Sequence, residues 1–271
     1  EGVLVVLVAS AEDPAGPGSG RRQLESLAAR LQRDCKEVTS LVQGVCPPDE
    51  AVPAPHNTKL LPRLGPARFE TSLRGLRFSV SAYSFFQTNT AQAEELYKAA
   101  EEMSGCGEGD VVWDLYCGTG SIGLSLARHR RPAKLVGFEM VSSAVADARK
   151  NAAANGVACA SFHKGELATM SPRELAGAQA GQPTLVVTDP PRQGMSAALV
   201  KQLRRLAPDR IVYVSCNPAP QARDCAALCD SLTAPGKVGP GGARYRLAGV
   251  RPVDMFPHTP HIEAVALLLR E

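Results

Sequence analysis

From residue 111 onward, short apolar runs rich in β-branched residues alternate with stretches in which apolar residues recur every three or four positions. The short runs predict buried strands, and the longer stretches predict amphipathic helices. Strands that alternate with helices form parallel sheets covered on both faces, so we expect a doubly wound α/β domain here. The predicted strands are 111–115, 134–139, 161–163, 185–188 and 211–215, the predicted helices are 121–128, 142–155, 197–206 and 220–232, and a last strand pair covers 245–254 and 262–269.

The pattern before residue 80 is looser, and we expect residues 1–80 to form a small α+β module that precedes the main domain at 81–271. The proline-rich stretch 46–66 is predicted as loop. The chain starts at Glu1 rather than at a methionine, and we expect it to be a piece of a longer protein. The elements predicted in this module are strands at 3–9 and 37–45, a helix at 23–31, and a hairpin at 69–81 that turns at Arg74-Gly75.

A glycine-rich turn follows the strand at 111–115 and leads directly into a helix. Its spacing, Gly118-x-Gly120-x-x-Gly123, lets the backbone approach a ligand closely and presents unpaired helix N–H groups. The same spacing fits the dinucleotide fingerprint, so the turn alone leaves a nicotinamide cofactor open. Two acids suit S-adenosylmethionine at least as well: Asp114, which ends the strand, could hold an amine, and Glu139, which ends the next strand, could hold two ribose hydroxyls.

Three further polar motifs stand at predicted strand ends: Asp189-Pro190-Pro191-Arg192, Ser215-Cys216-Asn217-Pro218, and the stretch from Pro257 to Glu263. Ligands of parallel sheets bind at the carboxyl ends of the strands, so we expect these motifs to share one site. A cysteine near helix N–H groups can act as a nucleophile, although a lone cysteine is more often a buried apolar residue. Glu263 would be costly if it were simply buried, and an acid in a partly dry pocket can serve as a general base.

Two aromatic residues, Phe85 and Phe86, stand beside Gln87 and Asn89 just before a predicted helix at 91–103. The four side chains could line a pocket, but their spacing alone favours core positions for the two phenylalanines and a surface position for the glutamine. The residue expected to cap the helix is Thr90.

Composition limits the possible functions without choosing one. The chain has 271 residues, 44% of them apolar, so it can bury a full core, and its net charge of +3 is compatible with RNA binding. No apolar run is long enough to span a membrane and no signal peptide is visible, so we expect an intracellular protein, cytoplasmic or organellar, that is not secreted. The eight cysteines contain no Cys-x-x-Cys pair, so we expect reduced thiols and no metal site.

Together, the motifs resemble the RNA uracil-5-methyltransferase family, which makes 5-methyluridine in transfer or ribosomal RNA. They occur in family order over about residues 70 to 270, and the first 80 residues resemble the family's central domain. The resemblance implies a Rossmann-like class I methyltransferase that uses S-adenosylmethionine, with Cys216 as nucleophile and Glu263 as base. Ser121 stands where some members have asparagine. The cofactor contacts that the resemblance implies come from Gln87, Tyr116, Ser121, Glu139, Glu166 and Asp189. The partner it implies is an RNA substrate, and we expect a monomer with no membrane partner.

Three other functions remain open from the sequence. An RNA cytosine-5-methyltransferase also uses a thiolate, but it commonly has a cysteine beside the Asp-Pro turn, where this chain has Arg192-Gln193-Gly194. An NAD-binding oxidoreductase is supported only by the glycine spacing. A catalytically silent RNA-binding module is disfavoured because both Cys216 and Glu263 are present.

Overall fold

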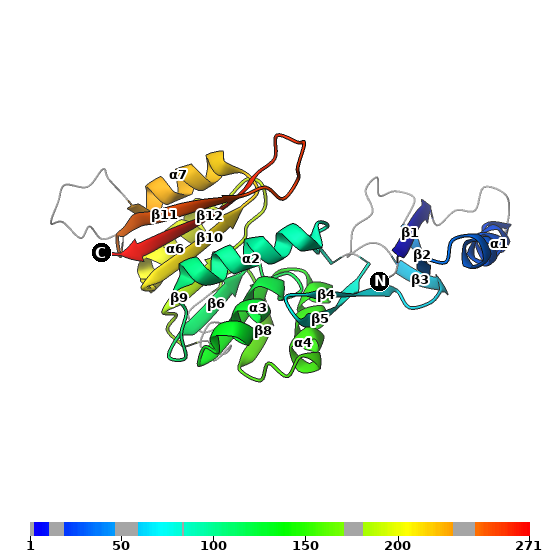
Figure 1. Ribbon diagram of the computed structural model, residues 1–271, viewed down its shortest axis with the longest axis horizontal. Helices are drawn as coiled ribbons and strands as arrows, with labels where there is room; N and C mark the ends of the chain where they lie inside the picture. The colour runs from blue at the N-terminus through cyan, green and yellow to red at the C-terminus, as the bar shows by residue number, and fades with distance from the viewer. Residues whose placement is uncertain (1–2, 11–18, 47–58, 83, 171–180, 230–241) are drawn as a thin grey trace. The chain divides into compact units, whose positions relative to one another are not determined.

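The computed structural model describes residues 3–10, 19–46, 59–82, 84–170, 181–229 and 242–271 (Figure 1). The chain divides into two compact units, one made of Glu1–Ser72 and Arg77–Phe85 and the other of Leu73–Leu76 and Phe86–Glu271. The domain boundary expected near residue 80 stays a prediction. Most of the predicted loop at 46–66 and the last residues of the predicted helix at 220–232 lie outside the described residues.

The first unit contains a three-stranded sheet in the order β1-β2-β3. Strands β1 (Val3–Ser10) and β2 (Val38–Cys46) are parallel, and helix α1 (Ser19–Asp34) connects them, as a parallel pair requires. Strand β3 (Lys59–Leu64) is antiparallel to β2, so the prediction of loop is wrong there. Pro62 hid the strand signal, and it is tolerated because β3 is an edge strand of this sheet.

Strands β4 (Arg68–Leu73) and β5 (Leu76–Ser81) form the predicted hairpin. Its two turn residues, Arg74 and Gly75, have φ angles of 50° and 74°, as a tight two-residue hairpin turn requires, so the predicted turn is confirmed. Within the second unit, the Arg74 backbone N–H donates to the Glu94 carboxylate over 2.7 Å, and the Arg74 guanidinium forms an ion pair with Glu101. Both contacts hold the turn against the helix that follows it.

The second unit is built on a seven-stranded sheet in the order β11-β12-β10-β9-β6-β7-β8 (Figure 1). The five strands β10, β9, β6, β7 and β8 are parallel, and β12 and β11 are antiparallel to their neighbours. The prediction of a doubly wound α/β sheet is confirmed. The strands are β6 (Val111–Leu115), β7 (Lys134–Glu139), β8 (Ala160–Lys164), β9 (Leu185–Thr188), β10 (Arg210–Ser215), β11 (Tyr245–Val253) and β12 (Glu263–Arg270).

Helices cover both faces of this sheet. The chain steps from β6 to β7 and β8 in one direction and from β9 to β10 in the other, so right-handed crossovers place α3 and α4 on one face and α6 on the opposite face. Helix α2 packs against α3, β10 and β12, and α7 packs against α6, β10 and β11. The helices are α2 (Thr90–Ser104), α3 (Ser121–Arg130), α4 (Ser142–Ala154), α6 (Ala197–Leu206) and α7 (Pro218–Cys229).

Helix α2 is capped one residue earlier than the sequence suggested. The Asn89 side chain accepts a hydrogen bond from the Gln92 backbone N–H over 3.2 Å, so Thr90 is the first helical residue and the predicted cap is wrong. The Asn89 amide also donates to the Met255 carbonyl over 3.0 Å. Asn89 therefore anchors the loop that leads from β11 towards Glu263.

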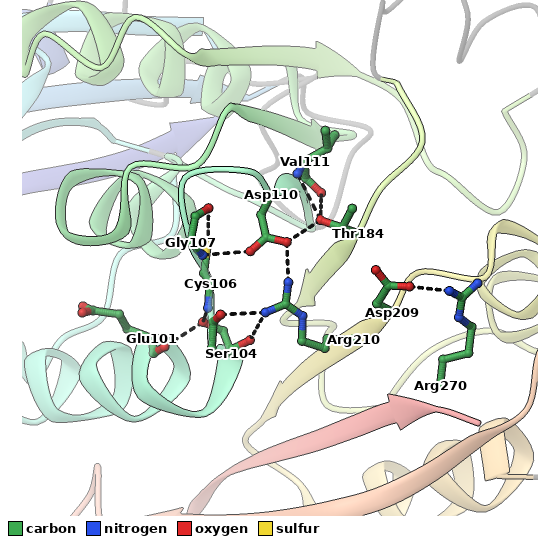
Figure 2. A network of polar contacts seen from close by, with 11 residues as sticks. Glu101, Ser104, Cys106, Gly107, Asp110, Val111, Thr184, Asp209, Arg210 and Arg270 are labelled. Atoms are coloured by element: carbon green, nitrogen blue, oxygen red, sulfur yellow. Dashed lines mark hydrogen bonds and ion pairs between the residues drawn. The ribbon is translucent and has the colours of Figure 1, made fainter.

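A network of polar contacts fixes the amino ends of the central strands (Figure 2). The Asp110 carboxylate accepts hydrogen bonds from the Gly107 N–H over 2.8 Å and from the Thr184 hydroxyl over 2.6 Å, and it pairs with the Arg210 guanidinium. Arg210 also donates to the Ser104 carbonyl over 3.0 Å. These contacts join the starts of β6, β9 and β10 at the edge of the sheet opposite the predicted site.

Candidate active site

The direction of strand order reverses between β6 and β9, and the expected site lies at this reversal. In open α/β sheets, a ligand crevice forms outside the carboxyl ends of the strands at such a point. The Asp189 N–H donates to the Leu115 carbonyl over 3.4 Å and joins the ends of the two strands. Four adjacent strands thus bring candidate residues to one edge: β6 carries Asp114, β9 leads to Asp189, β10 leads to Cys216, and β12 begins at Glu263.

Asp114 is buried, with 1% of its surface exposed, and it faces the start of α3. Its Oδ2 accepts a hydrogen bond from the Gly123 N–H over 3.0 Å. A Cβ at residue 123 would lie 2.5 Å from this oxygen, which explains the third glycine of the loop. Burial raises the Asp114 pKa to about 7, and the charge of Glu139 adds to the shift.

Glu139 and Tyr116 line a cleft beside the glycine loop. The two Glu139 carboxylate oxygens accept hydrogen bonds from the Gly118 N–H over 3.0 Å and from the Val141 N–H over 2.8 Å. Tyr116 has a φ of 58°, a conformation that non-glycine residues rarely adopt and that is concentrated at functional sites. The predicted contact residue Glu166 lines the same cleft. Its full lining is Leu115, Tyr116, Phe138, Glu139, Met140, Gly165, Glu166, Leu167 and Leu199.

Ser121, another predicted contact residue, begins α3 and lies 2.7 Å from the Tyr97 hydroxyl, oxygen to oxygen. Tyr97 is buried in α2, and burial, followed by the charges of Asp189, Asp114 and Glu263, raises its pKa. Tyr97 was not among the residues predicted from the sequence. In the sequence Tyr97 is one apolar position of an amphipathic helix. Only the packing of α2 on the sheet places its hydroxyl near the three carboxylates named above.

The pairing of β10 with β12 brings Cys216 and Glu263 to the same level of the sheet. Ser215 lies opposite Ala264 in this antiparallel pair. One residue forward along the chain from Ser215 is Cys216, and one residue back from Ala264 is Glu263, so the two lie next to each other at this end of the pair. Glu263 is 4% exposed and accepts no hydrogen bond from the described residues, and burial raises its pKa to about 7. Burial and the charges of Glu263 and Asp189 raise the pKa of the Cys216 thiol, while Arg192 acts in the opposite direction.

Arg192 is held beside this pair by two neighbouring motifs. A guanidinium nitrogen of Arg192 lies 3.3 Å from the His261 Nδ1, and the Asn217 side chain donates to the Arg192 carbonyl over 3.1 Å. The three motifs expected to share a site are therefore in direct contact. Because a cation stabilises a thiolate, the Arg192 guanidinium favours the ionised form of Cys216, as does a backbone hydrogen bond to the thiol.

The aromatic motif before α2 is arranged differently from the simplest prediction. Phe85 is 69% exposed, whereas Gln87 is only 7% exposed, so the positions expected from spacing are wrong for both, and Phe86 is half-buried. Spacing gives no information on which side chains meet a partner in the folded chain, and the motif lies outside any helix or strand. Gln87 is buried, but no described contact joins it to the other predicted site residues.

The residues present fit a ligand that combines a cation with an adenosine. Asp114, Asp189 and Glu263 all have raised pKa values, and none of them forms an ion pair with a basic side chain in the described part of the chain. A positively charged ligand would relieve this excess of buried acid. The neighbouring cleft has a free volume of about 10 Å³, so it must widen to admit an adenosine, but its Glu139 carboxylate and apolar walls have the chemistry that a ribose and a purine contact.

A family model described as tRNA (uracil-5-)-methyltransferase matches residues 68–271. The chain belongs to this family. The predicted family and the predicted Rossmann-like methyltransferase fold are both confirmed. No described helix has the length and apolar character needed to cross a membrane.

Two curated relatives and one solved structure illustrate the similarity. An uncharacterized RNA methyltransferase from Porphyromonas gingivalis is 42% identical over 201 residues, which is 74% of this chain and 40% of that protein. Another from Halalkalibacterium halodurans is 38% identical over 244 residues, 90% of this chain and 49% of that protein. The chain thus spans less than half the length of these relatives. The crystal structure of the Pyrococcus abyssi tRNA (uracil-54, C5)-methyltransferase in complex with S-adenosyl-L-homocysteine matches with a TM-score of 0.71 and 30% identity, over 99% of this chain and 57% of that one.

Proposed function

We propose that this family member transfers a methyl group from S-adenosylmethionine to carbon 5 of a uridine in transfer or ribosomal RNA, through a covalent adduct of Cys216. The observation that carries the proposal is the register of β10 and β12, which brings a thiol and a buried acid to the same level beside Asp189. The names of the relatives support the RNA substrate, and the name of the Pyrococcus abyssi enzyme supports the uracil target and the cofactor.

We infer that the cleft beside the glycine loop holds the adenosine part of the cofactor, with Glu139 on the ribose and Tyr116 and Glu166 near the purine. Asp114 and Asp189 would hold the cationic part, because Asp114 is buried, Asp189 is half-buried, and both lack a basic partner among the described residues. Ser121 and Gln87 complete the proposed contacts. When bound, S-adenosylmethionine supplies a methyl group on a positively charged sulfur atom.

Carbon 5 of uracil is a weak nucleophile, and the proposed role of Cys216 is to activate it. The thiol first loses its proton to solvent, which the partly exposed side chain allows and the Arg192 cation favours. The thiolate then forms a bond from sulfur to carbon 6, and the electron pair of the double bond moves onto carbon 5 as an enolate. Carbon 5 thereby becomes able to accept the methyl group. The target base must be unstacked for this attack on its face.

Glu263 is the proposed base that ends the reaction. Once carbon 5 carries both a methyl group and a hydrogen, the ionised carboxylate removes that hydrogen as a proton. The electron pair of the broken C–H bond re-forms the double bond and expels the Cys216 thiolate from carbon 6. A pKa of about 7 suits this task, because the carboxylate is basic enough to accept a proton and is still ionised in half of the molecules near neutral pH.

The two proposed roles predict opposite outcomes on a denaturing gel. Cys216→Ala should abolish methyl transfer and should form no covalent protein–RNA complex. Glu263→Gln should still attack and methylate, but it should fail to release, so methylated RNA should remain attached to the protein as a slowly migrating band. Wild-type protein should be trapped in the same way by RNA that contains 5-fluorouridine, which has no proton to remove at carbon 5.

Cys159→Ala is the matched control, because Cys159 is also a partly buried free thiol but precedes β8 at the amino edge of the sheet. It should turn over and release RNA as the wild type does. Turnover by Cys216→Ala, or release of methylated RNA by Glu263→Gln at the wild-type rate, would show that the roles are assigned wrongly.

A further inference from the structure

A buried amide joins the two strands that lead to Cys216 and Glu263. Gln221 lies in the first turn of α7 and is 4% exposed. Its side-chain Nε2 donates to the Tyr213 carbonyl of β10 over 2.8 Å and to the Ala264 carbonyl of β12 over 2.9 Å. One side chain therefore uses both of its amide hydrogens on two different strands.

The two acceptors lie close in sequence to the proposed catalytic pair. Tyr213 precedes Cys216 by three residues, and Ala264 directly follows Glu263. The pairing of β10 with β12 ends at Ser215 and Ala264, so the ladder no longer holds the chain at Cys216. Gln221 thus adds a second tie across the last pairs of this ladder, just before regular strand pairing stops.

We propose that Gln221 is a positioning residue for the proposed reaction, one that fixes the separation of the Cys216 thiol and the Glu263 carboxylate by joining the ends of their strands. This inference rests on the proposed function. The Gln221 side chain donates hydrogen bonds to two backbone carbonyls and to neither proposed reacting group, so its proposed role is indirect. Because Cys216 and Glu263 would act on adjacent ring atoms of one base, a small error in their separation has a large cost. A displacement of about 1 Å can reduce the rate on the order of a hundredfold.

The first test removes the two hydrogen bonds and keeps the shape. Gln221→Met has a similar length but no donor, so the strand ends lose this tie and keep only their ladder pairing. We expect kcat for methyl transfer to fall roughly 10- to 100-fold while the dissociation constants of S-adenosylmethionine and RNA stay within about twofold of wild type. Gln221→Glu, which keeps the length and retains one donor when protonated, should lose less.

Tyr245→Phe is the matched control for stability. The Tyr245 hydroxyl is also a buried donor to a backbone carbonyl, that of Pro208 at 2.8 Å, but it lies at the start of β11, at the amino edge of the sheet. Tyr245→Phe should lower the free energy of unfolding of the second unit by about as much as Gln221→Met does, and it should leave kcat near the wild-type value. A fall in kcat of the same size in Gln221→Met and Tyr245→Phe would overturn the proposal.

The second test needs no methyl transfer. The Glu263 charge raises the pKa of the Cys216 thiol, so Glu263→Gln should lower the pH midpoint of Cys216 alkylation by iodoacetamide, followed by peptide mass spectrometry. In the Gln221→Met background, the same change should produce a smaller shift, because the separation of the two groups is less tightly fixed. Equal shifts in both backgrounds would overturn the positioning role. If the wild type transferred no methyl group while the shifts differed as expected, the proposed function would fail and the coupling through Gln221 would stand.

Discussion

Single residues at this site combine burial with charge in a way that costs stability. Asp114 is 1% exposed, and its pKa of about 7 lies far above the value of about 4 expected for an unfolded chain. Below pH 4 the carboxyl is protonated in both states. Between pH 4 and 7 the unfolded chain ionises first, so the contribution of Asp114 to the free energy of unfolding falls as the pH rises. The buried charge of Asp114 lowers the free energy of unfolding at neutral pH, and a neutral side chain could accept the Gly123 hydrogen bond without this loss.

Asp114→Asn should therefore stabilise the protein and impair its ligand binding. The asparagine oxygen can still accept the Gly123 N–H, and the buried charge is removed. We expect the free energy of unfolding at pH 8 to rise by on the order of 1–3 kcal/mol, with little change at pH 4. The affinity for S-adenosylmethionine should fall at least about tenfold, because a charge-assisted contact to its amine is lost.

Urea unfolding at the two pH values and titration calorimetry measure these effects. A stability difference between Asp114→Asn and the wild type that is no larger at pH 8 than at pH 4, or unchanged S-adenosylmethionine affinity in Asp114→Asn, would contradict the role given to this acid. The same calorimetry is repeated with NAD as the ligand. Binding of NAD in place of S-adenosylmethionine would contradict the cofactor assignment.

At the scale of elements, the loop between β9 and α6 is fixed by one glycine and one buried acid. Gly194 has a φ of 81°, and a Cβ at this position would lie 2.6 Å from the Asp224 Oδ2. That oxygen accepts hydrogen bonds from the Met195 N–H over 2.7 Å and from the Tyr213 hydroxyl over 2.8 Å. Asp224 thus ties the loop that carries Asp189 to strand β10, and residue 194 has no room for a side chain.

Gly194→Ala should destabilise the second unit far more than the same change at Gly75. Both glycines have positive φ angles, but nothing lies within 4 Å of a Cβ at Gly75. We expect a cost of about 1 kcal/mol at Gly75 from backbone strain alone, and about 2–4 kcal/mol at Gly194, where the added methyl group also displaces the Asp224 carboxylate. Urea unfolding followed by circular dichroism compares the two variants. Equal losses would show that the close approach to Asp224 is unimportant.

The elements that the sequence predicted well are those whose signal is local. The runs 111–115, 134–139 and 185–188 became β6, β7 and β9 with the predicted bounds, because buried parallel strands are continuous apolar runs. β3 was missed because Pro62 hides an edge strand, and Asn89 caps α2 in place of Thr90. Phe85 and Gln87 exchanged their expected environments, and Tyr97 and Gln221 went unnoticed. The hydrogen-bond partners of Tyr97 and Gln221 lie on other elements, so no periodicity reveals them.

At the scale of the whole molecule, stabilising contacts and candidate chemistry lie at opposite edges of one sheet. The Asp110 and Arg210 network joins the amino ends of the central strands (Figure 2). The candidate site residues lie at the carboxyl ends of the strands. The predicted alternation of strands and helices was enough to place the candidate site at the carboxyl ends, because ligands of such parallel sheets bind at that edge. The motifs could therefore be assigned to one site from the sequence, although their individual contacts could not.

RNA binding by this chain alone is expected to be weak and sensitive to salt. The net charge is only +3, and the chain spans less than half the length of its curated relatives. Each phosphate that is neutralised contributes a slope of about −0.7 to −0.9 to the dependence of log affinity on log salt, so a contact with a few phosphates should lose roughly tenfold or more between 50 and 200 mM salt. A filter assay at several salt concentrations measures this slope. Nanomolar binding that does not change with salt would contradict the expectation.

The most direct test of the central claim follows the hydrogen on carbon 5. RNA labelled with tritium at carbon 5 of uridine is incubated with the protein and S-adenosylmethionine, and tritium release is compared with methyl incorporation. Wild-type protein should release one tritium for each methyl group transferred, whereas Glu263→Gln should incorporate a methyl group and retain the tritium, and Cys216→Ala should do neither. RNA labelled at carbon 5 of cytidine should release none. Methylation by the wild type with the uridine tritium retained, or release from cytidine instead, would contradict the proposal that Cys216 and Glu263 act at carbon 5 of uridine.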